Sequence, residues 1–209
     1  MSRYTEAVCR LCRREGVKLF LKGERCYTEK CAVTRRGTPP GQHGAGRKRT
    51  STGYGPQLRE KQKAKRIYGL GETQFKNTFN KAVKKEGMAG ENLLIALECR
   101  LDNVVYRMGM AESRNEARQL VTHGHFRLNG KKVNIPSIAL KKGDVVTVRE
   151  GSLERVKIKS LIDNLDNRQS VKWLDVDIKN VVATVNELPT RADVDFPFEE
   201  HLIVELYSK

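Results

Sequence analysis

The chain has 209 residues, 38% of them hydrophobic and 31% charged, which is typical of a globular protein. No apolar run approaches the ~20 residues that span a bilayer, and the first residues lack the apolar core of a signal peptide, so we expect a cytoplasmic protein without a membrane partner. The net charge of +15 is uneven: residues 1–90 hold 22 Lys and Arg against 7 Asp and Glu, whereas residues 151–209 hold 8 against 11. Because neutralising phosphates releases condensed counterions, this basic segment favours a polyanionic partner.

The first feature along the chain is a cluster of cysteines. Cys9, Cys12, Cys26 and Cys31 follow the pattern C-x2-C-x13-C-x4-C, and two close pairs of this kind bring four thiolates to one tetrahedral ion. We predict one structural Zn²⁺, since four protein ligands leave no position open for water. An iron–sulfur cluster is the less favoured alternative. A cytosolic chain argues against stable disulfides.

The next segments change from loop to helix. Residues 34–57 are rich in Gly, Pro, Thr, Arg and Lys and lack apolar periodicity, which predicts an extended basic loop that its ligand orders. Apolar residues then recur every three or four positions, which predicts helices within 58–87 and one long amphipathic helix from Asn92 to Met108. Gly109 follows this helix as a left-handed cap.

Residues 113–130, SRNEARQLVTHGHFRLNG, predict a short helix followed by a hairpin. Ser113 is the expected N-cap, with Glu116 completing a capping box, and Gly124 ends the helix. Strands over 126–128 and 133–135 flank the Asn129-Gly130 turn. Arginines at positions 114 and 118 stand one helical turn apart, where they can reach successive phosphates.

The remainder of the chain predicts three strands and two helices. KKGDVVTVRE, VKWLDVD and VVATVNEL read as strands, residues 153–164 as a helix, and PFEEHLIVELYS as a helix, with a strand as its alternative. The acidic tail is expected to pack against the basic head. The predicted fold is mixed α/β (α+β): a helix-rich outer domain built from both chain ends, with an inserted small α/β module. We predict a zinc segment and loop over 1–45, the helical outer domain over 46–98, the module over 99–164, and the completing strands and helix over 165–209.

Residues 100–148 resemble the small RNA-binding module of the ribosomal S4 type, through the run from RLDNVVYR to KKGDVVTV. In that module two helices and a small curved sheet present a basic groove to structured RNA. The resemblance implies that the residues matching its motif face RNA: Arg100, Asn103, Arg114, Arg118, His123, His125, Arg127 and Asn129. Lys131, in the adjoining turn, is added to this set.

The rest of the chain resembles the bacterial small-subunit ribosomal protein S4 family in its zinc-binding, four-cysteine form. RRGTPPGQHG, YGPQLREKQKAKRIYGL, GENLLIALECRLDNVVYR and EEHLIVELYSK carry this resemblance. It implies a structural constituent of the cytoplasmic ribosome that binds a multi-helix junction in the 5′ region of small-subunit rRNA, nucleates assembly and contributes to translational accuracy. Its implied partners are this rRNA, neighbouring small-subunit proteins and mRNA near the entry path, with no small-molecule substrate.

Backbone neutralisation by basic side chains is the expected mode of binding. The contacts predicted outside the module are Arg10, Arg13, Arg14, Arg35, Arg36, Gln42, His43, Arg47, Lys48, Arg49, Lys61, Lys65 and Arg66.

Three other functions compete with this interpretation. An enzyme is disfavoured, because no phosphate-binding loop, nucleophile elbow or metalloprotease motif is found. CRLDN resembles the segment around the catalytic aspartate of some pseudouridine synthases, but Asp102 lies within a helical stripe and no separate catalytic domain remains. A zinc-dependent DNA-binding regulator needs a base-reading helix near the metal, whereas the segment after Cys31 is rich in Gly and Pro. A free-standing stress protein carrying the same module would not need the family-like head and tail.

Overall fold

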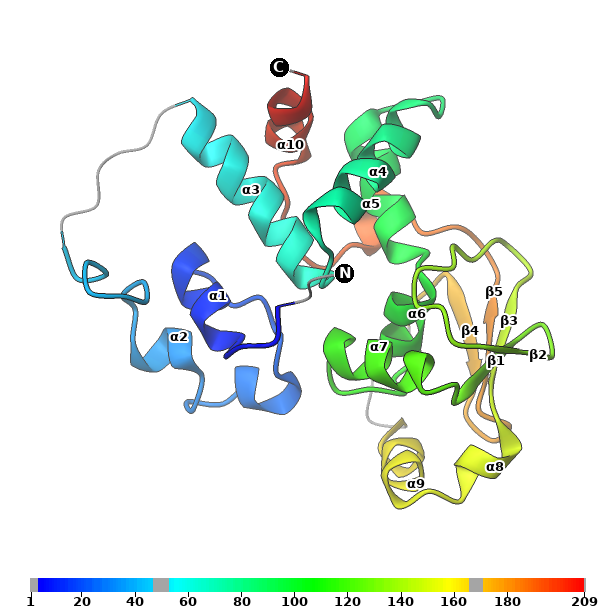
Figure 1. Ribbon diagram of the computed structural model, residues 1–209. Coiled ribbons are helices and arrows are strands. Elements are labelled where there is room, and N and C mark those ends of the chain that lie inside the picture. The colour runs from blue at the N-terminus through cyan, green and yellow to red at the C-terminus, as the bar shows by residue number, and fades with distance from the viewer. Residues whose placement is uncertain (1–3, 47–52, 166–170, 209) are drawn as a thin grey trace. The chain divides into compact units, whose positions relative to one another are not determined.

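The computed structural model describes residues 4–46, 53–165 and 171–208 (Figure 1). Arg47, Lys48 and Arg49, three of the predicted RNA contacts, lie outside these residues. The chain forms two compact units, which we call the terminal unit (Met1–Leu93 with Phe196–Lys209) and the central unit (Leu94–Asp195). Because the chain contains both helices and an antiparallel sheet, the predicted mixed α/β class is confirmed. None of the helices in the described ranges is long and apolar enough to cross a membrane.

The terminal unit is helical. Its elements are α1 (Cys9–Glu15), the 3-10 turn η1 (Gly23–Cys26), α2 (Ala32–Arg35), α3 (Tyr54–Ile67), α4 (Glu72–Val83), the start of α5 (Ala89–Glu98), and α10 (Glu200–Tyr207). Figure 1 shows α10 alongside α3, although the two helices are far apart in the sequence. Both ends of the chain thus contribute to one unit.

Aromatic packing and polar contacts hold α10 in place. The Tyr207 ring lies 4.7 Å from that of Phe79, and its hydroxyl donates to Glu72 at 3.0 Å. Gln57 of α3 donates to the Glu205 carboxylate at 2.8 Å. Glu72 also accepts from the ammonium of Lys61 at 2.6 Å and from that of Lys65 at 2.8 Å. Glu72 therefore joins α3, α4 and α10.

We expect Glu72→Gln to flatten the acid dependence of stability. Burial opposes ionisation of Glu72, but hydrogen bonds from Lys61 and Lys65 outweigh it and lower its pKa from 4.5 to about 2. Ionised Glu72 therefore stabilises the fold above about pH 4.5, and this contribution is lost as the pH falls toward 2. Since the side chain is 48% exposed, we expect at most ~1 kcal/mol. Urea unfolding of both proteins between pH 6 and 2.5 measures it. Glu86→Gln, at an exposed position, is the control, and equal pH profiles for all three proteins would contradict the prediction.

The predicted long helix from Asn92 to Met108 is wrong, because the chain forms α5 and then a separate α6 (Leu101–Arg107). Arg100 between them is extended (φ −72°, ψ 140°) and pairs with Ala139 in an isolated bridge. The Leu101 amide donates to the Ile138 carbonyl at 2.8 Å. Apolar periodicity persists through both helices, so only these long-range hydrogen bonds reveal the break.

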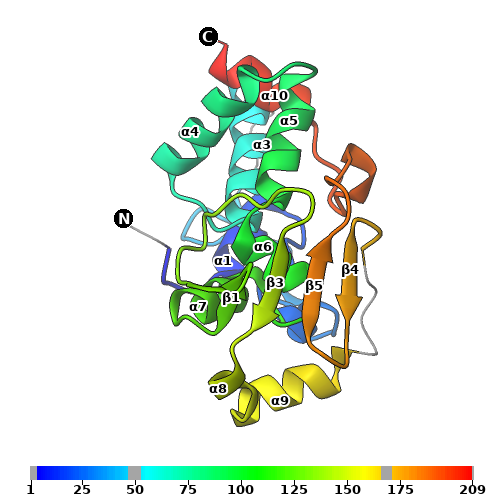
Figure 2. The ribbon, with the colours of Figure 1, turned by 90° about the vertical axis from the view of Figure 1, so that its right-hand side faces the viewer.

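The central unit contains a five-stranded antiparallel sheet in the order β2-β1-β3-β5-β4, and Figure 2 shows β1, β3, β5 and β4 of this sheet in that order. The strands are β1 (Phe126–Leu128), β2 (Lys131–Val133), β3 (Val145–Val148), β4 (Leu174–Asp177) and β5 (Val182–Val185). The other elements are α6, α7 (Arg114–Thr122), α8 (Glu150–Leu153), α9 (Val156–Asp163) and η3 (Arg191–Asp193).

Buried and more exposed side chains alternate along β3 and β5, so the sheet has one buried face and one accessible face. Phe126, Val146 and Ala183 are fully buried in a core shared with α6 and α7, whereas Arg127 and Thr147, paired with each other across β1 and β3, are only half-buried. The helices therefore cover one face, and the other carries polar side chains. The sequence interpretation placed the strands of 165–209 in the outer domain, but β5 pairs with β3 and so joins the sheet of the central unit.

The start and end of α7 largely follow the sequence prediction. The Ser113 hydroxyl accepts from the Glu116 amide at 3.3 Å, which confirms the N-cap, while the Glu116 carboxylate accepts from the amide of Glu112 at 2.7 Å. The reciprocal bond of the predicted capping box therefore reaches one residue further back. Gly124 ends the helix with φ +72°. The residues predicted as one helix over 153–164 fall in α8 and α9, and β2 begins two residues earlier than predicted.

Candidate nucleic-acid interface and cysteine cluster

The structure brings the four predicted metal ligands together. Cys9 and Cys12 lie on α1, Cys26 ends η1, and Cys31 immediately precedes α2. All four line one small cavity, together with Lys22, Arg25, Ala32 and Val33. All five cysteines of the chain have free thiols, and the fifth, Cys99, is buried between α5 and α6.

Burial favours the protonated forms of two thiols in this cavity. It is the main cause that raises the pKa of Cys12 to about 11; the other three cysteines act in the same direction and the hydrogen bond from the Leu19 amide opposes them. Burial also raises the pKa of Cys26. The Lys22 amide donates to the sulfur of Cys26 at 3.4 Å. Among the residues that the structure describes, no group of three or more His, Cys, Asp or Glu side chains is arranged as a preformed metal site. The cavity therefore gathers the donors without setting them in a coordination geometry.

A buried carboxylate joins the cysteine segment to α3. The side chain of Glu15, at the end of α1, is 0% exposed and accepts from Arg59 at 3.1 Å and from Arg66. Arg66, one of the predicted RNA contacts, is thus held in an internal ion pair. The exposed part of its side chain is 19%.

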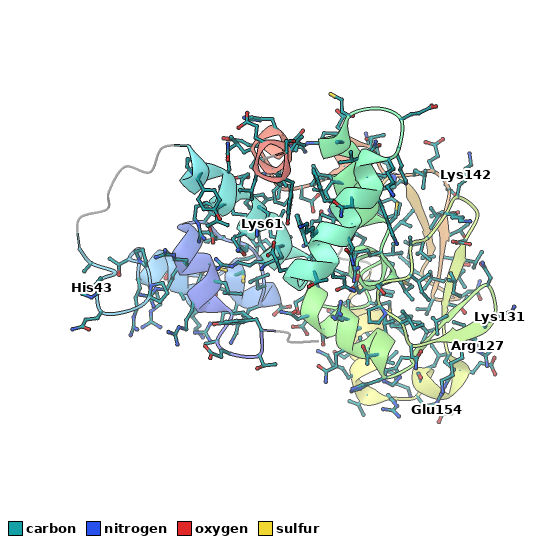
Figure 3. All side chains as sticks on the ribbon, turned by 45° about the horizontal axis from the view of Figure 1, so that its top comes forward. His43, Lys61, Arg127, Lys131, Lys142 and Glu154 are labelled. Carbon is teal, nitrogen blue, oxygen red and sulfur yellow. The ribbon has the colours of Figure 1, made fainter. Side chains whose placement is uncertain are left out.

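Most of the predicted contacts in the terminal unit are exposed. Those with exposed side chains are Arg10, Arg14, Arg35, Arg36, Gln42 and His43, and Figure 3 shows His43 pointing away from the loop that carries it. Arg13 is half-buried and donates to the Thr38 carbonyl at 2.9 Å, which ties α1 to the start of this loop. Lys65 is half-buried on α3 in its pair with Glu72.

Two buried carboxylates, Asp102 and Glu98, bind arginines between α5, α6 and α7. Arg100 donates twice to Asp102, at 3.0 and 2.7 Å, and Arg118 donates to the same carboxylate at 2.9 Å. Glu98 accepts two hydrogen bonds from Arg107, both at 2.9 Å, and one from Asn103 at 2.7 Å. These contacts link α5, α6 and α7 through charged groups.

Arg114 and Arg118 remain partly accessible within this network. Arg114 donates to the Asn103 side-chain oxygen at 2.8 Å, and its guanidinium lies 4.5 Å above the Tyr106 ring. The exposed fractions of the Arg114 and Arg118 side chains are 14% and 16%. Both guanidinium groups therefore have internal partners and still reach the surface.

Four of the predicted RNA contacts are buried, so their prediction as RNA contacts is wrong and their roles are structural. Lys61, Arg100, Asn103 and His125 are between 2% and 6% exposed. Direct contact with a phosphate needs an accessible donor, whereas these side chains bind internal partners. The ring of His125 lies 3.0 Å from the Ser152 hydroxyl, and burial lowers its pKa, with the Arg155 charge acting in the same direction.

The remaining predicted contacts lie at the surface of the central unit. His123, Asn129 and Lys131 are exposed, and Arg127 is half-buried in a 3.2 Å pair with Glu150. The sequence interpretation missed three exposed lysines near them: Lys132, Lys141 and Lys142. The signal was present, because the NGKK and KKGD segments both place lysines beside a glycine turn.

Two helices packed on one face of a small antiparallel sheet define a module of the S4 class, and the family model described as S4 domain matches residues 99–146. The model of the ribosomal protein S4/S9 N-terminal domain matches residues 3–98. The chain is 60% identical to the small ribosomal subunit protein uS4 of Clostridioides difficile (strain 630) and 58% identical to that of Pelotomaculum thermopropionicum, over 100% of each chain. The uS4 of Caldicellulosiruptor bescii is also 60% identical over 100% of both chains. The chain therefore belongs to the ribosomal protein S4 family.

Proposed function

We propose that this chain is a non-catalytic, structural constituent of the small ribosomal subunit that binds the rRNA of that subunit. The observation that carries this proposal is the 60% identity to small ribosomal subunit protein uS4 over the whole of both chains. The charge of +15 and the exposed basic side chains on both units support it, because phosphate neutralisation supplies most of the affinity for nucleic acid.

In the central unit, the side chains that bind rRNA are Arg114 and Arg118, which internal partners hold in place. A guanidinium held by internal partners loses less conformational freedom when it meets a phosphate than a free side chain does. Asp102 holds Arg118, and Asn103 with the Tyr106 ring holds Arg114. The buried residues therefore set where the accessible arginines stand, and these arginines meet the RNA backbone.

One structural Zn²⁺ on Cys9, Cys12, Cys26 and Cys31 belongs to this proposal. The common cavity supports it, as do the amide hydrogen bonds from Leu19 and Lys22, which favour the thiolate forms of two of the cysteines. The flanking Arg25 and Lys22 reduce the repulsion among four thiolates. Bound zinc would fix the first 31 residues as a small domain, with the iron–sulfur cluster as the less favoured occupant.

The finer assignments follow the family resemblance. We infer that the RNA site is a multi-helix junction in the 5′ region, that binding there nucleates assembly, and that the protein contributes to accuracy near the mRNA entry path. Neighbouring small-subunit proteins complete its partners. The exposed loop over 36–46, with Gln42 and His43 at its surface, is suited to enter a space between RNA helices.

Binding to small-subunit rRNA across a series of salt concentrations tests the function, with duplex DNA and an unrelated structured RNA as competitors. We expect tight binding localised by footprinting to one junction in the 5′ region. Equal affinity for all three polyanions would contradict the proposal and reopen the DNA-binding regulator and the stress protein.

We expect the double substitution Arg114→Ala/Arg118→Ala to weaken rRNA binding and to flatten its dependence on salt. Two lost phosphate contacts lower the slope of log K against log salt by about 1.5 to 2. Filter binding between 50 and 300 mM KCl measures this slope, and the wild-type slope in the variant would show that neither arginine contacts phosphate. Lys172→Ala/Lys179→Ala, at two exposed lysines that flank β4 in the same unit, is the control matched in charge.

A further inference from the structure

We infer that two adjacent turns of the central unit form a separate site for RNA backbone phosphates, lined by four lysines. This inference rests on the proposed function and adds residues to it. We call the site the lysine tip: Lys131 and Lys132 after the turn between β1 and β2, and Lys141 and Lys142 before β3. Since β1 and β3 are antiparallel with Leu128 opposite Val146, both turns lie at the same end of the sheet.

Hydrogen bonds make the two turns one rigid support. The Asn129 side chain donates to the Asp144 carboxylate at 2.9 Å and accepts from the Val145 amide at 2.9 Å. The other oxygen of Asp144 accepts from the Lys141 amide at 2.7 Å. The Asn129 backbone also donates to the Val145 carbonyl at 2.9 Å. Asn129 is therefore a positioning residue, in place of the RNA contact that the resemblance implies.

The lysine tip has an excess of positive charge. All four lysines are exposed, and in the part of the chain that the structure describes none of their ammonium groups forms an ion pair with a carboxylate. Figure 3 shows Lys131 and Lys142 projecting away from the central unit. Asp144 is the one acidic residue of segment 129–144, and its two oxygens already accept the hydrogen bonds described above.

The stem of Lys132 has a defined path. A Cβ placed on Gly124 would lie 2.9 Å from the Lys132 Cε, so the lysine stem passes close to the C-terminal end of α7. Gly124 has φ +72°, which favours glycine. Lys132 therefore extends the lysine tip along β2 toward the C-terminal end of α7.

The chemistry of the tip selects the RNA backbone rather than the bases. A lysine ammonium is a compact point charge suited to phosphate, without the planar fork with which arginine reads guanine. Segment 129–144 contains no aromatic residue, so it offers no surface on which a base can stack. The ligand is therefore the phosphodiester backbone of an RNA helix, bound without regard to its sequence.

The test compares Lys141→Ala/Lys142→Ala with the wild-type full chain for binding to small-subunit rRNA. We expect affinity about 10-fold weaker at 150 mM KCl and a salt slope lower by about 1.5 to 2. The matched control is Lys172→Ala/Lys179→Ala, since both lysines are exposed and flank β4 in the same unit. We expect it to bind within twofold of the wild type.

Failure of the proposed function and failure of the lysine tip give different binding results. If the wild-type chain does not prefer small-subunit rRNA, the proposed function is wrong. If the wild type does prefer it, while Lys141→Ala/Lys142→Ala keeps the wild-type affinity and slope, the lysine tip is not an RNA site. Thermal unfolding of each variant confirms that the comparison is between folded proteins.

A double-mutant cycle tests the positioning role of Asn129. Asn129 has φ +49°, which glycine adopts freely, so Asn129→Gly removes the side-chain hydrogen bonds without adding strain. We expect about threefold weaker rRNA binding in the wild-type background and no further loss in Lys141→Ala/Lys142→Ala. An equal loss in both backgrounds would show that Asn129 acts independently of these lysines and overturn its positioning role.

Discussion

Replacing Asp102 with alanine should destabilise the central unit more than any substitution at its surface. Asp102 is 4% exposed and accepts from two arginines, one of which, Arg100, is itself 4% exposed. Removing the carboxylate leaves the Arg100 charge buried without its partner, a change that costs about 3 to 5 kcal/mol. Arg118 is more accessible and can turn toward water, so most of the effect comes from Arg100.

Urea unfolding followed by tryptophan fluorescence measures the free energy of unfolding of the central unit. Trp173 is the single tryptophan of the chain, and it is 3% exposed in the core of the central unit. We expect the Asp102→Ala midpoint to fall sharply, and Asp102→Asn, which keeps an acceptor, to fall between that variant and the wild type. Asp175→Ala, at an exposed position of β4, should stay within ~0.5 kcal/mol of the wild type. An equally small change for Asp102→Ala would show that the buried pair contributes little.

Loss of the proposed zinc ligands should unfold the start of the terminal unit while leaving the central unit folded. Structural zinc sites of this size bind with about 10 to 16 kcal/mol at neutral pH, and this binding free energy is also folding free energy. The short elements α1, η1 and α2, of 7, 4 and 4 residues, are too brief to be stable alone. We expect Cys9→Ser/Cys12→Ser to abolish binding of one zinc per chain and to collapse the amide dispersion of residues 4–31.

The matched control is Cys99→Ser, at a buried cysteine outside the cavity. It should keep one zinc per chain by metal analysis and keep the amide spectrum of the first 31 residues. A Cys9→Ser/Cys12→Ser protein with the wild-type spectrum would contradict the structural role, and iron with sulfide in the purified protein would favour the cluster.

Zinc affinity should rise with pH. Burial raises the pKa of Cys12 to about 11 and raises that of Cys26, so the metal must displace protons from thiols that are neutral at pH 7. The apparent affinity therefore increases as the pH rises from 6 toward 9, with proton release on binding. Competition with a chromophoric chelator at fixed ionic strength measures it. Affinity independent of pH would mean that the thiols are already ionised.

The exposed basic side chains and the buried ones differ in role: the exposed ones are available to a ligand, and the buried ones bind internal carboxylates. The side chains of Arg10, Arg14 and Arg35 are exposed to solvent, where the proposed function requires positive charge for rRNA phosphates. Glu98 and Asp102 instead hold arginines at defined places between α5, α6 and α7. Net charge alone does not distinguish the two groups, which is why substitutions at each are expected to affect different measurements.

Local features of this protein could be predicted from the sequence because short-range interactions determine them. The Ser113 cap, the Gly124 helix end and the Asn129-Gly130 turn are each set by a few adjacent residues, and the mixed α/β class follows from the order of the periodic segments. Cysteine spacing likewise predicted that four thiols would meet, and all four line one cavity.

Only the tertiary structure decided which polar residues are buried and which strands are neighbours. The break at Arg100 depends on hydrogen bonds to residues nearly forty positions later, and β5 joins β3 through pairing that no local pattern encodes. Arg100 and Arg127 are both arginines of the same module, but one is buried beside Asp102 and the other reaches the surface. The physical reason is that helix and turn propensities act over a few residues, whereas burial and ion pairing depend on contacts that form only when distant segments pack.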